Sequence, residues 1–235
     1  MITQAMILAA GKGTRMQPLT LTTPKPLIDV AGKPLIVWHI ERLAQAGIRD
    51  ITLNAGYLAD VLIAGLDKLD LQSCLGVRLN ISVEQGEPLE TAGGIKYALS
   101  QGLLADAPFI LVNGDVWTEY EFSALINHQL GDKLAHLVMV NNPEHNPTGD
   151  FVLQDGQATT KTDGSQAYTF AGISVMSPKL VADVGVGEIA PLAPRLKTAM
   201  TNHQVTGELM QTHWVDVGTL ERLAQVEQYI KSRQV

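Results

Sequence analysis

The sequence predicts an α/β fold in which helices flank a mixed β-sheet. Its 235 residues are 46% hydrophobic and 17% charged, an ordinary composition for a globular domain. Short apolar runs alternate with longer helical patterns through the first half, which is typical of βαβ units around a parallel sheet. After about residue 140, Pro, Gly, Asn and Asp become frequent and predict more antiparallel pairing. We expect one domain over 1–235, because no repeat, low-complexity tract or linker divides the chain.

The first half is expected to contribute most of the parallel strands. The runs that read as strands are short and apolar or alternating, and cover 5–10, 51–54, 78–83 and 109–112. The runs that read as helices cover 34–46, 58–66, 91–104 and 121–130. Pro34 stands in the first turn of the first helix and Gly47 at its end, the usual positions for these residues.

The second half contains fewer and shorter patterns. Strands are expected over 135–140, 168–175 and 214–217, and helices over 192–200 and 219–231. Asp155-Gly156 is a two-residue hairpin signal, and Thr219 is a helix-capping residue type.

Charge and apolar content limit the partners and the location. A net charge of −7 argues against a nucleic-acid partner, which needs clustered Lys and Arg. The single cysteine, Cys74, cannot form an intrachain disulfide. No stretch approaches the roughly 18 apolar residues of a membrane span. We therefore expect a soluble, cytoplasmic protein without a membrane partner, either a monomer or a small homo-oligomer.

A glycine-rich segment directly follows the first expected strand. In Ala9-Ala10-Gly11-Lys12-Gly13-Thr14-Arg15, the glycines allow backbone N–H groups to approach an anion closely, which favours a phosphate site. A dinucleotide-binding turn is excluded, because Met16 stands where that motif needs Gly or Ala, and prolines prevent a helix from starting. The spacing of a P-loop is also absent.

Three cations, Lys12, Arg15 and Lys25, belong to this loop. Surface charges that face only water are the common alternative for such side chains. Prolines on both sides of Lys25 favour function, because they fix the backbone that aims the side chain.

The same loop carries a family resemblance. The run from Leu8 to Thr20, followed by Pro24-Lys25-Pro26-Leu27 and Gly32-Lys33-Pro34, closely resembles the opening of the sugar-phosphate nucleotidyltransferases. The resemblance implies the nucleotide-diphospho-sugar transferase fold, a Rossmann-like mixed sheet flanked by helices. Its nucleotide-binding half would be about 1–140 and its sugar-binding half about 141–235. It implies that Arg15 stabilises the pyrophosphate, that Lys25 bridges the reacting phosphates, and that the triphosphate is wrapped by Gly11, Lys12, Gly13 and Thr14.

Two aspartates are candidates for a metal site. Asp115 follows Asn113-Gly114, and Asp216 belongs to Trp214-Val215-Asp216-Val217-Gly218-Thr219, so each lies where a strand gives way to a loop. A single Asp in a turn is equally an Asx cap, whereas two carboxylates at one crevice suit Mg²⁺. In the family, Gly-Asp and Asp-x-Gly-Thr hold magnesium, which implies Asp115 and Asp216 as ligands and Mg²⁺ as the cofactor. The attacking phosphate is already ionised, so none of the six histidines needs a catalytic role.

Base and sugar contacts follow from the resemblance alone. The segment 84–94 is similar to the base-reading loop of the family and implies Gln85 and Thr91, although Thr91 is also a candidate helix cap. Glu90 stands where the family usually has glycine. Asn113 and Asp150 are the implied sugar contacts, and Asp150 equally fits an ordinary turn. The Glu-Lys-Pro triplet that holds the sugar phosphate in many relatives is absent, and Lys161 is a weak substitute.

Within the family, the loop 90–94, the stretch 205–208 and the segment 214–222 look most like the N-acetylmuramate 1-phosphate uridylyltransferases of peptidoglycan recycling. This implies a reaction of UTP with N-acetylmuramate 1-phosphate that gives UDP-N-acetylmuramate and pyrophosphate. A mannose 1-phosphate guanylyltransferase is the rival. A noncatalytic sugar-nucleotide sensor would be expected to lack Lys25, Arg15 or an aspartate, and all are present. A nicotinamide-dependent oxidoreductase would need the complete glycine motif.

Overall fold

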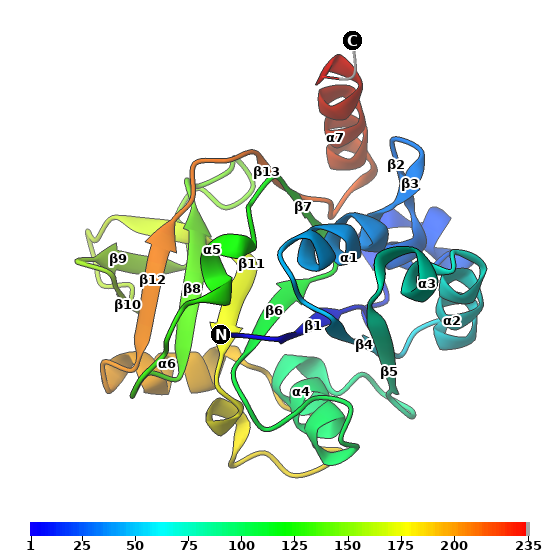
Figure 1. The fold of residues 1–235 in the computed structure, drawn as a ribbon. Coiled ribbons are helices and arrows are strands. Elements are labelled where there is room, and N and C mark those ends of the chain that lie inside the picture. The colour runs from blue at the N-terminus through cyan, green and yellow to red at the C-terminus, as the bar shows by residue number, and fades with distance from the viewer. Residues whose placement is uncertain (234–235) are drawn as a thin grey trace.

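A nine-stranded mixed sheet forms the centre of the computed structural model, which describes residues 1–233. The strand order is β5-β4-β1-β6-β11-β8-β12-β10-β9. The first four are mutually parallel, as predicted, and comprise β1 (Gln4–Leu8), β4 (Asp50–Ala55), β5 (Arg78–Val83) and β6 (Phe109–Asn113). Helices cover both faces of this sheet (Figure 1).

The second half of the chain extends the sheet mainly by antiparallel pairing, also as predicted. Its strands are β8 (Ala135–Val140), β9 (Phe151–Gln154), β10 (Gln157–Thr160), β11 (Ala167–Met176) and β12 (Val205–Leu209). The hairpin between β9 and β10 turns at Asp155 and Gly156, whose φ angles of 51° and 74° are those of a type I′ turn. β12 was not predicted, and it pairs parallel to β8.

The helices bury the alternate side chains of the strands. In β1, Ala5 and Ile7 face one core and Met6 the other. The first core is covered by α1 (Leu35–Gln45), α2 (Ala59–Lys68), α3 (Leu71–Leu75) and α5 (Ser123–Ile126). The second is covered by α4 (Glu90–Ser100) and α6 (Ala193–Thr201) together with the 3₁₀ turn Pro178–Val181.

A third, smaller core lies beside the glycine loop. It joins α7 (Leu220–Arg233) to the short hairpin of β2 (Asp29–Val30) and β3 (Lys33–Pro34). The two-stranded sheet of β7 (Val116–Thr118) and β13 (Trp214–Asp216) leads into it. Thr219 caps α7 as predicted, because its Oγ1 accepts from Arg222 N at 3.3 Å.

Two predicted helices have different bounds. The helix over 121–130 is wrong beyond Ile126, whose carbonyl accepts from Ile2 N at 2.7 Å and so is bonded to the N-terminal segment. The helix over 91–104 ends at Ser100, because Gly102 is left-handed and Leu103 N bonds back to Ala98 O. Within residues 1–233, no helix has both the length and the apolar character that crossing a membrane requires.

Candidate active site

A cavity of about 440 Å³ opens at the carboxyl ends of β1, β4 and β6. β1 and β6 are neighbours, but the chain leaves β1 toward β4 on its other side, so the crevice between them is a topological switch point. Of the predicted site residues, the cavity is lined by Gly11, Lys12, Gly13, Thr14, Arg15, Lys25, Thr91, Asn113 and Asp115. Gln85, Asp150 and Asp216 do not line it.

The glycine loop is held in place from its outer side. Gly13 has a φ of 60°, and its carbonyl accepts from Thr20 Oγ1 at 2.9 Å. Tyr57 OH in turn donates to Thr20 O at 2.9 Å. Among the hydrogen bonds of residues 1–233, none is donated by the backbone N–H groups of residues 11–14. These N–H groups are therefore free to bind an anion in the cavity.

Lys25 is the cation that the loop buries. It begins the 3₁₀ turn Lys25–Leu27, is 8% exposed, and places Nζ 2.9 Å from Asp115 Oδ2. Lys12 is exposed and lies 3.8 Å from Glu87, a loose surface pair. The burial of Lys25 between two prolines favours the functional interpretation of this residue over that of a surface charge.

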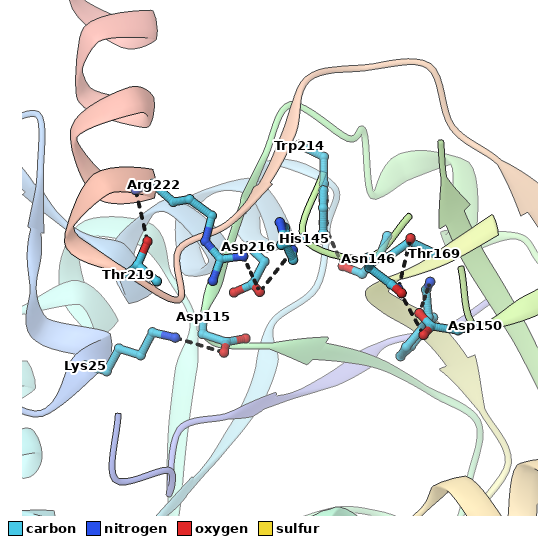
Figure 2. Close-up of polar contacts among 12 residues, drawn as sticks. Lys25, Asp115, His145, Asn146, Asp150, Thr169, Trp214, Asp216, Thr219 and Arg222 are labelled. Atoms are coloured by element: carbon cyan, nitrogen blue, oxygen red, sulfur yellow. Dashed lines mark hydrogen bonds and ion pairs between the residues drawn. The ribbon is translucent and has the colours of Figure 1, made fainter. Parts of the chain in front are cut away.

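Asp115 reaches the cavity through a close backbone contact. Gly114 N donates to Leu8 O at 2.9 Å, and a β carbon at position 114 would collide with that carbonyl. Only glycine permits β6 to pass so close to the end of β1. The next residue is then turned toward Lys25 (Figure 2).

Asp216 lies next to Asp115 although 100 residues separate them in sequence. Asp216 pairs with Val116 in the β7–β13 sheet, and Val217 N donates to Asp115 O at 2.8 Å. Its Oδ2 is 3.1 Å from Arg222 Nη1 and 3.6 Å from His145 Nε2 (Figure 2). Within residues 1–233, its buried Oδ1 has no hydrogen-bond partner.

Gly218 lies between Arg15, Arg222 and this second carboxylate. A β carbon built on Gly218 would lie 2.9 Å from both Arg15 Nη2 and Asp216 Oδ1, and would also meet Arg222 Nη2. Burial, followed by the charge of Arg222, lowers the pKa of His145 below its usual value, so the imidazole is neutral at pH 7. Asp216 is therefore paired with the guanidinium of Arg222.

The loop expected to read the base begins α4 without a side-chain cap. Thr91 does not cap the helix. Instead, Ala190 O accepts from Ala92 N and Gly93 N at 2.9 and 3.1 Å. Glu90 has a φ of 62°, a left-handed backbone that favours glycine. Gln85 is exposed.

The predicted sugar contacts divide between two places. Asn113 ends β6 and lines the cavity. Asp150 forms a separate cluster, in which its carboxylate accepts from Phe170 N at 2.8 Å and Asn146 Nδ2 at 3.1 Å (Figure 2). These bonds join Asp150 to β11 and to the segment that precedes Asp150. Lys161 Nζ donates to Gly149 O at 2.6 Å, which ties it to the same segment.

Four residues of the site were missed from the sequence. Asn54 and Glu84 line the cavity, and His145 and Arg222 contact Asp216. A signal existed for the first pair, because each is a polar residue at the end of a parallel strand, as Asn113 is. No local pattern identified His145 or Arg222, which reach Asp216 only through the tertiary fold.

Known proteins are similar to this chain in fold and in sequence. The family described as "Nucleotidyl transferase" matches residues 4–157. The chain is 44% identical over 228 residues to the N-acetylmuramate alpha-1-phosphate uridylyltransferase of Neisseria meningitidis serogroup B, covering 95% of this chain and 96% of that protein. It is 44% identical over 231 residues to a mannose-1-phosphate guanyltransferase of Emericella nidulans, covering 92% of this chain but only 60% of the relative. The structure of a UDP-glucose pyrophosphorylase complexed with UDP-glucose superposes with a TM-score of 0.80 at 15% identity, covering 99% of this chain and 100% of that one.

The cavity at the switch point of the sheet is lined by cations and Asp115, with Asp216 beside it, an arrangement suited to phosphorylated substrates. The sequence match over residues 4–157 is more specific. The chain belongs to the nucleotidyl transferase family.

Proposed function

We propose that this enzyme transfers a uridylyl group from UTP to N-acetylmuramate 1-phosphate, with Mg²⁺ as its cofactor, and releases pyrophosphate. The class of reaction, nucleotidyl transfer to a sugar 1-phosphate, is the one that its relatives are named for. The observation that carries the finer proposal is the match to the uridylyltransferase, which extends over nearly the full length of both chains.

The residues of the chain suit a reaction between two anions. A phosphate oxygen of the sugar substrate attacks the α-phosphorus of the nucleotide, the bond to the β-phosphate oxygen breaks, and pyrophosphate leaves. The N–H groups of residues 11–14 would bind the triphosphate. Lys25 and Arg15 would offset the repulsion between the reactants and stabilise the negative charge that develops on the leaving group.

Two aspartates fit a magnesium ion. Asp115 lies in the turn directly before β7, Asp216 ends the paired strand β13, and Asp216 Oδ1 is a buried acceptor without a hydrogen-bond partner among residues 1–233. In that part of the chain, no group of three or more His, Cys, Asp or Glu side chains is arranged around a metal position. Two carboxylates are sufficient for Mg²⁺, which takes one or two of them and completes its shell with phosphate oxygens and water. When bound, the ion supplies Lewis-acid stabilisation of phosphate charge.

The rival function is guanylyl transfer to mannose 1-phosphate. The guanyltransferase of Emericella nidulans has the same identity to this chain, over 60% of its own length. The match to the uridylyltransferase covers 96% of that protein, and this match supports UTP and N-acetylmuramate 1-phosphate.

Pyrophosphate release tests the proposal. The four common nucleoside triphosphates would be crossed with N-acetylmuramate, N-acetylglucosamine, glucose and mannose 1-phosphates, with Mg²⁺ and with EDTA. We expect turnover with UTP and N-acetylmuramate 1-phosphate that EDTA abolishes. A preference for GTP with mannose 1-phosphate would establish the rival, and full activity in EDTA would exclude the magnesium assignment.

A further inference from the structure

Two buried side chains connect the glycine loop to the segment 84–94, which is expected to read the base and which we call the base loop. Asn54, in β4, and Glu84, directly after β5, are each 5% exposed and line the cavity. Ala9 N donates to Asn54 Oδ1 at 2.7 Å, and Asn54 Nδ2 donates to Glu84 Oε1 at 2.7 Å. Leu89 N donates to Glu84 Oε2 at 2.9 Å. We call this chain of hydrogen bonds the Asn54–Glu84 bridge.

A glycine inside α4 provides the space for the bridge. A β carbon at Gly94 would lie 2.7 Å from Glu84 Oε1 and 3.1 Å from Asn54 Nδ2. Glycine is otherwise unfavourable in the interior of a helix. Its presence here is explained by the close approach of the two bridge side chains.

The base loop is held from its other side as well. Ala190 N donates to Leu89 O at 3.0 Å, and Ala190 O accepts from the first turn of α4. Leu89 therefore has its N–H bonded to the bridge and its carbonyl bonded to residue 190. The next residue, Glu90, lines the cavity on a left-handed backbone. The backbone of the loop is thus fixed by hydrogen bonds within the protein.

We propose that Asn54 and Glu84 are positioning residues that determine nucleobase selectivity, by fixing residues 89–91 at a set distance from the phosphate-binding loop. A nucleotide whose phosphates bind at residues 11–14 would place its base against residues 89–91. The bridge sets the position of these residues. Both carboxylate oxygens of Glu84 accept hydrogen bonds from the protein, and the bond from Leu89 N lets Glu84 act through the loop. The inference rests on the proposed nucleotidyl transfer only in requiring a nucleoside triphosphate in the cavity.

A pair of complementary substitutions isolates the bridge. Glu84→Gln places an amide NH₂ where one oxygen accepted, so one of the two donors loses its partner. Asn54→Asp places two carboxylates against each other. In the double variant, the new amide at position 84 can donate to the new carboxylate at position 54 and accept from Leu89 N. That carboxylate also accepts from Ala9 N, so every hydrogen bond of the bridge is restored.

Dissociation constants for the four nucleoside triphosphates would be measured by titration without a sugar phosphate. Each single variant should bind the preferred nucleotide about 10-fold more weakly and discriminate between bases less, as loss of one buried hydrogen bond implies. The double variant should recover most of the affinity and the base preference. The KM for the sugar 1-phosphate should change much less, because the bridge fixes residues 89–91 and not Asn113, the expected sugar contact. Ser82→Ala is the matched control, because it removes a buried bond of the same strand, Ser82 Oγ to Gln101 Oε1 at 2.8 Å, that does not involve either loop.

The inference would be overturned if the single variants kept the wild-type base preference, or if the double variant were no better than either single one. Should a single variant fail to fold, a folded double variant decides: a retained preference supports the bridge and a lost one contradicts it. If the wild-type enzyme prefers GTP to UTP, the proposed uridylyl specificity fails, whereas the bridge is still judged by the same loss and recovery.

Discussion

Each of the two candidate metal ligands is paired with one cation. Asp115 contacts Lys25, and Asp216 contacts Arg222. These cations neutralise the two carboxylates. We expect the phosphates of a substrate to offer the same cations new partners and so to release the carboxylates.

Lys25 is the side chain in which this exchange is most direct. Lys25→Ala removes the one buried cation of the glycine loop and should lower kcat roughly 10²- to 10³-fold, as expected for loss of one preorganised charge contact. Steady-state kinetics at saturating substrates measures this. Lys68→Ala, on the exposed last turn of α2, is the control. Equal kcat in both variants would make Lys25 a structural residue.

The aspartates should be essential for turnover but not for the fold. Asp115→Asn and Asp216→Asn keep the side-chain shape and remove the charge that a magnesium ion needs, so each should abolish magnesium-dependent turnover. Circular dichroism and pyrophosphate release would be compared with Asp106→Asn, an exposed loop substitution. A near-normal rate in either site variant would refute the metal assignment.

Glu90 carries backbone strain that glycine would not. Its φ of 62° lies in the left-handed region, so Glu90→Gly should raise the free energy of unfolding by about 0.5–1 kcal/mol. Glu221→Gly, in the first turn of α7, should lower it by a similar amount, because its backbone is helical. Denaturant unfolding compares the two, and destabilisation by Glu90→Gly would show that the Glu90 side chain stabilises the loop.

At the scale of elements, a turn or helix was predicted correctly where no distant part of the chain competed for its backbone hydrogen bonds. Asp155-Gly156 forms the predicted turn. Both residues favour a positive φ, and the flanking strands β9 and β10 pair with each other. The helix expected over 121–130 stopped where Ile126 O met Ile2 N, a partner 124 residues away. β12 gave no signal because Thr206, Gly207 and Glu208 interrupt its apolar pattern.

The helix α7 connects stability to the site. Thr219 caps its first turn, and Arg222, in the same turn, contacts Asp216. Thr219→Ala should cost about 1 kcal/mol of unfolding free energy, the usual value of such a cap. Thr219→Ser, which keeps the hydroxyl, should retain most of it. Thermal unfolding of the three proteins measures the difference, and equal midpoints would mean that the Thr219 cap contributes nothing.

At the scale of the whole molecule, the site could be predicted from strand ends but not from side-chain partners. The glycine loop follows β1, Asp115 follows β6, and Lys25 stands between two prolines. All of them line the cavity. Arg222 and His145 could not be predicted, because their partner Asp216 reaches the site only through the pairing of β7 with β13. About 100 residues of sequence separate these two strands. The Asn54–Glu84 bridge depends likewise on which strands are neighbours.

Acid stability should depend on one buried histidine. His39 is 1% exposed, and burial lowers its pKa from 6.5 to about 4. Between these values the unfolded chain takes up a proton that the folded protein does not, so stability falls as pH falls from 6.5 toward 4. The loss attributable to His39 amounts to about 3 kcal/mol, at about 1.4 kcal/mol per pKa unit.

Urea unfolding of His39→Leu at pH 7 and at pH 4.5 tests this. Relative to wild type, the variant should gain stability at the lower pH, because it has no imidazole to protonate. His203→Asn, at an exposed position, should follow the wild-type pH dependence. Parallel pH dependence of wild type and His39→Leu would contradict the buried-neutral assignment.

The central claim is the identity of the two substrates, and competition tests it most directly. UTP and GTP at equal concentration, together with equal N-acetylmuramate 1-phosphate and mannose 1-phosphate, would be incubated with the enzyme and Mg²⁺, and the products followed by phosphorus NMR and mass spectrometry. Product ratios then report the relative kcat/KM values. The account predicts UDP-N-acetylmuramate and pyrophosphate as the main products, and GDP-mannose as the main product would contradict it.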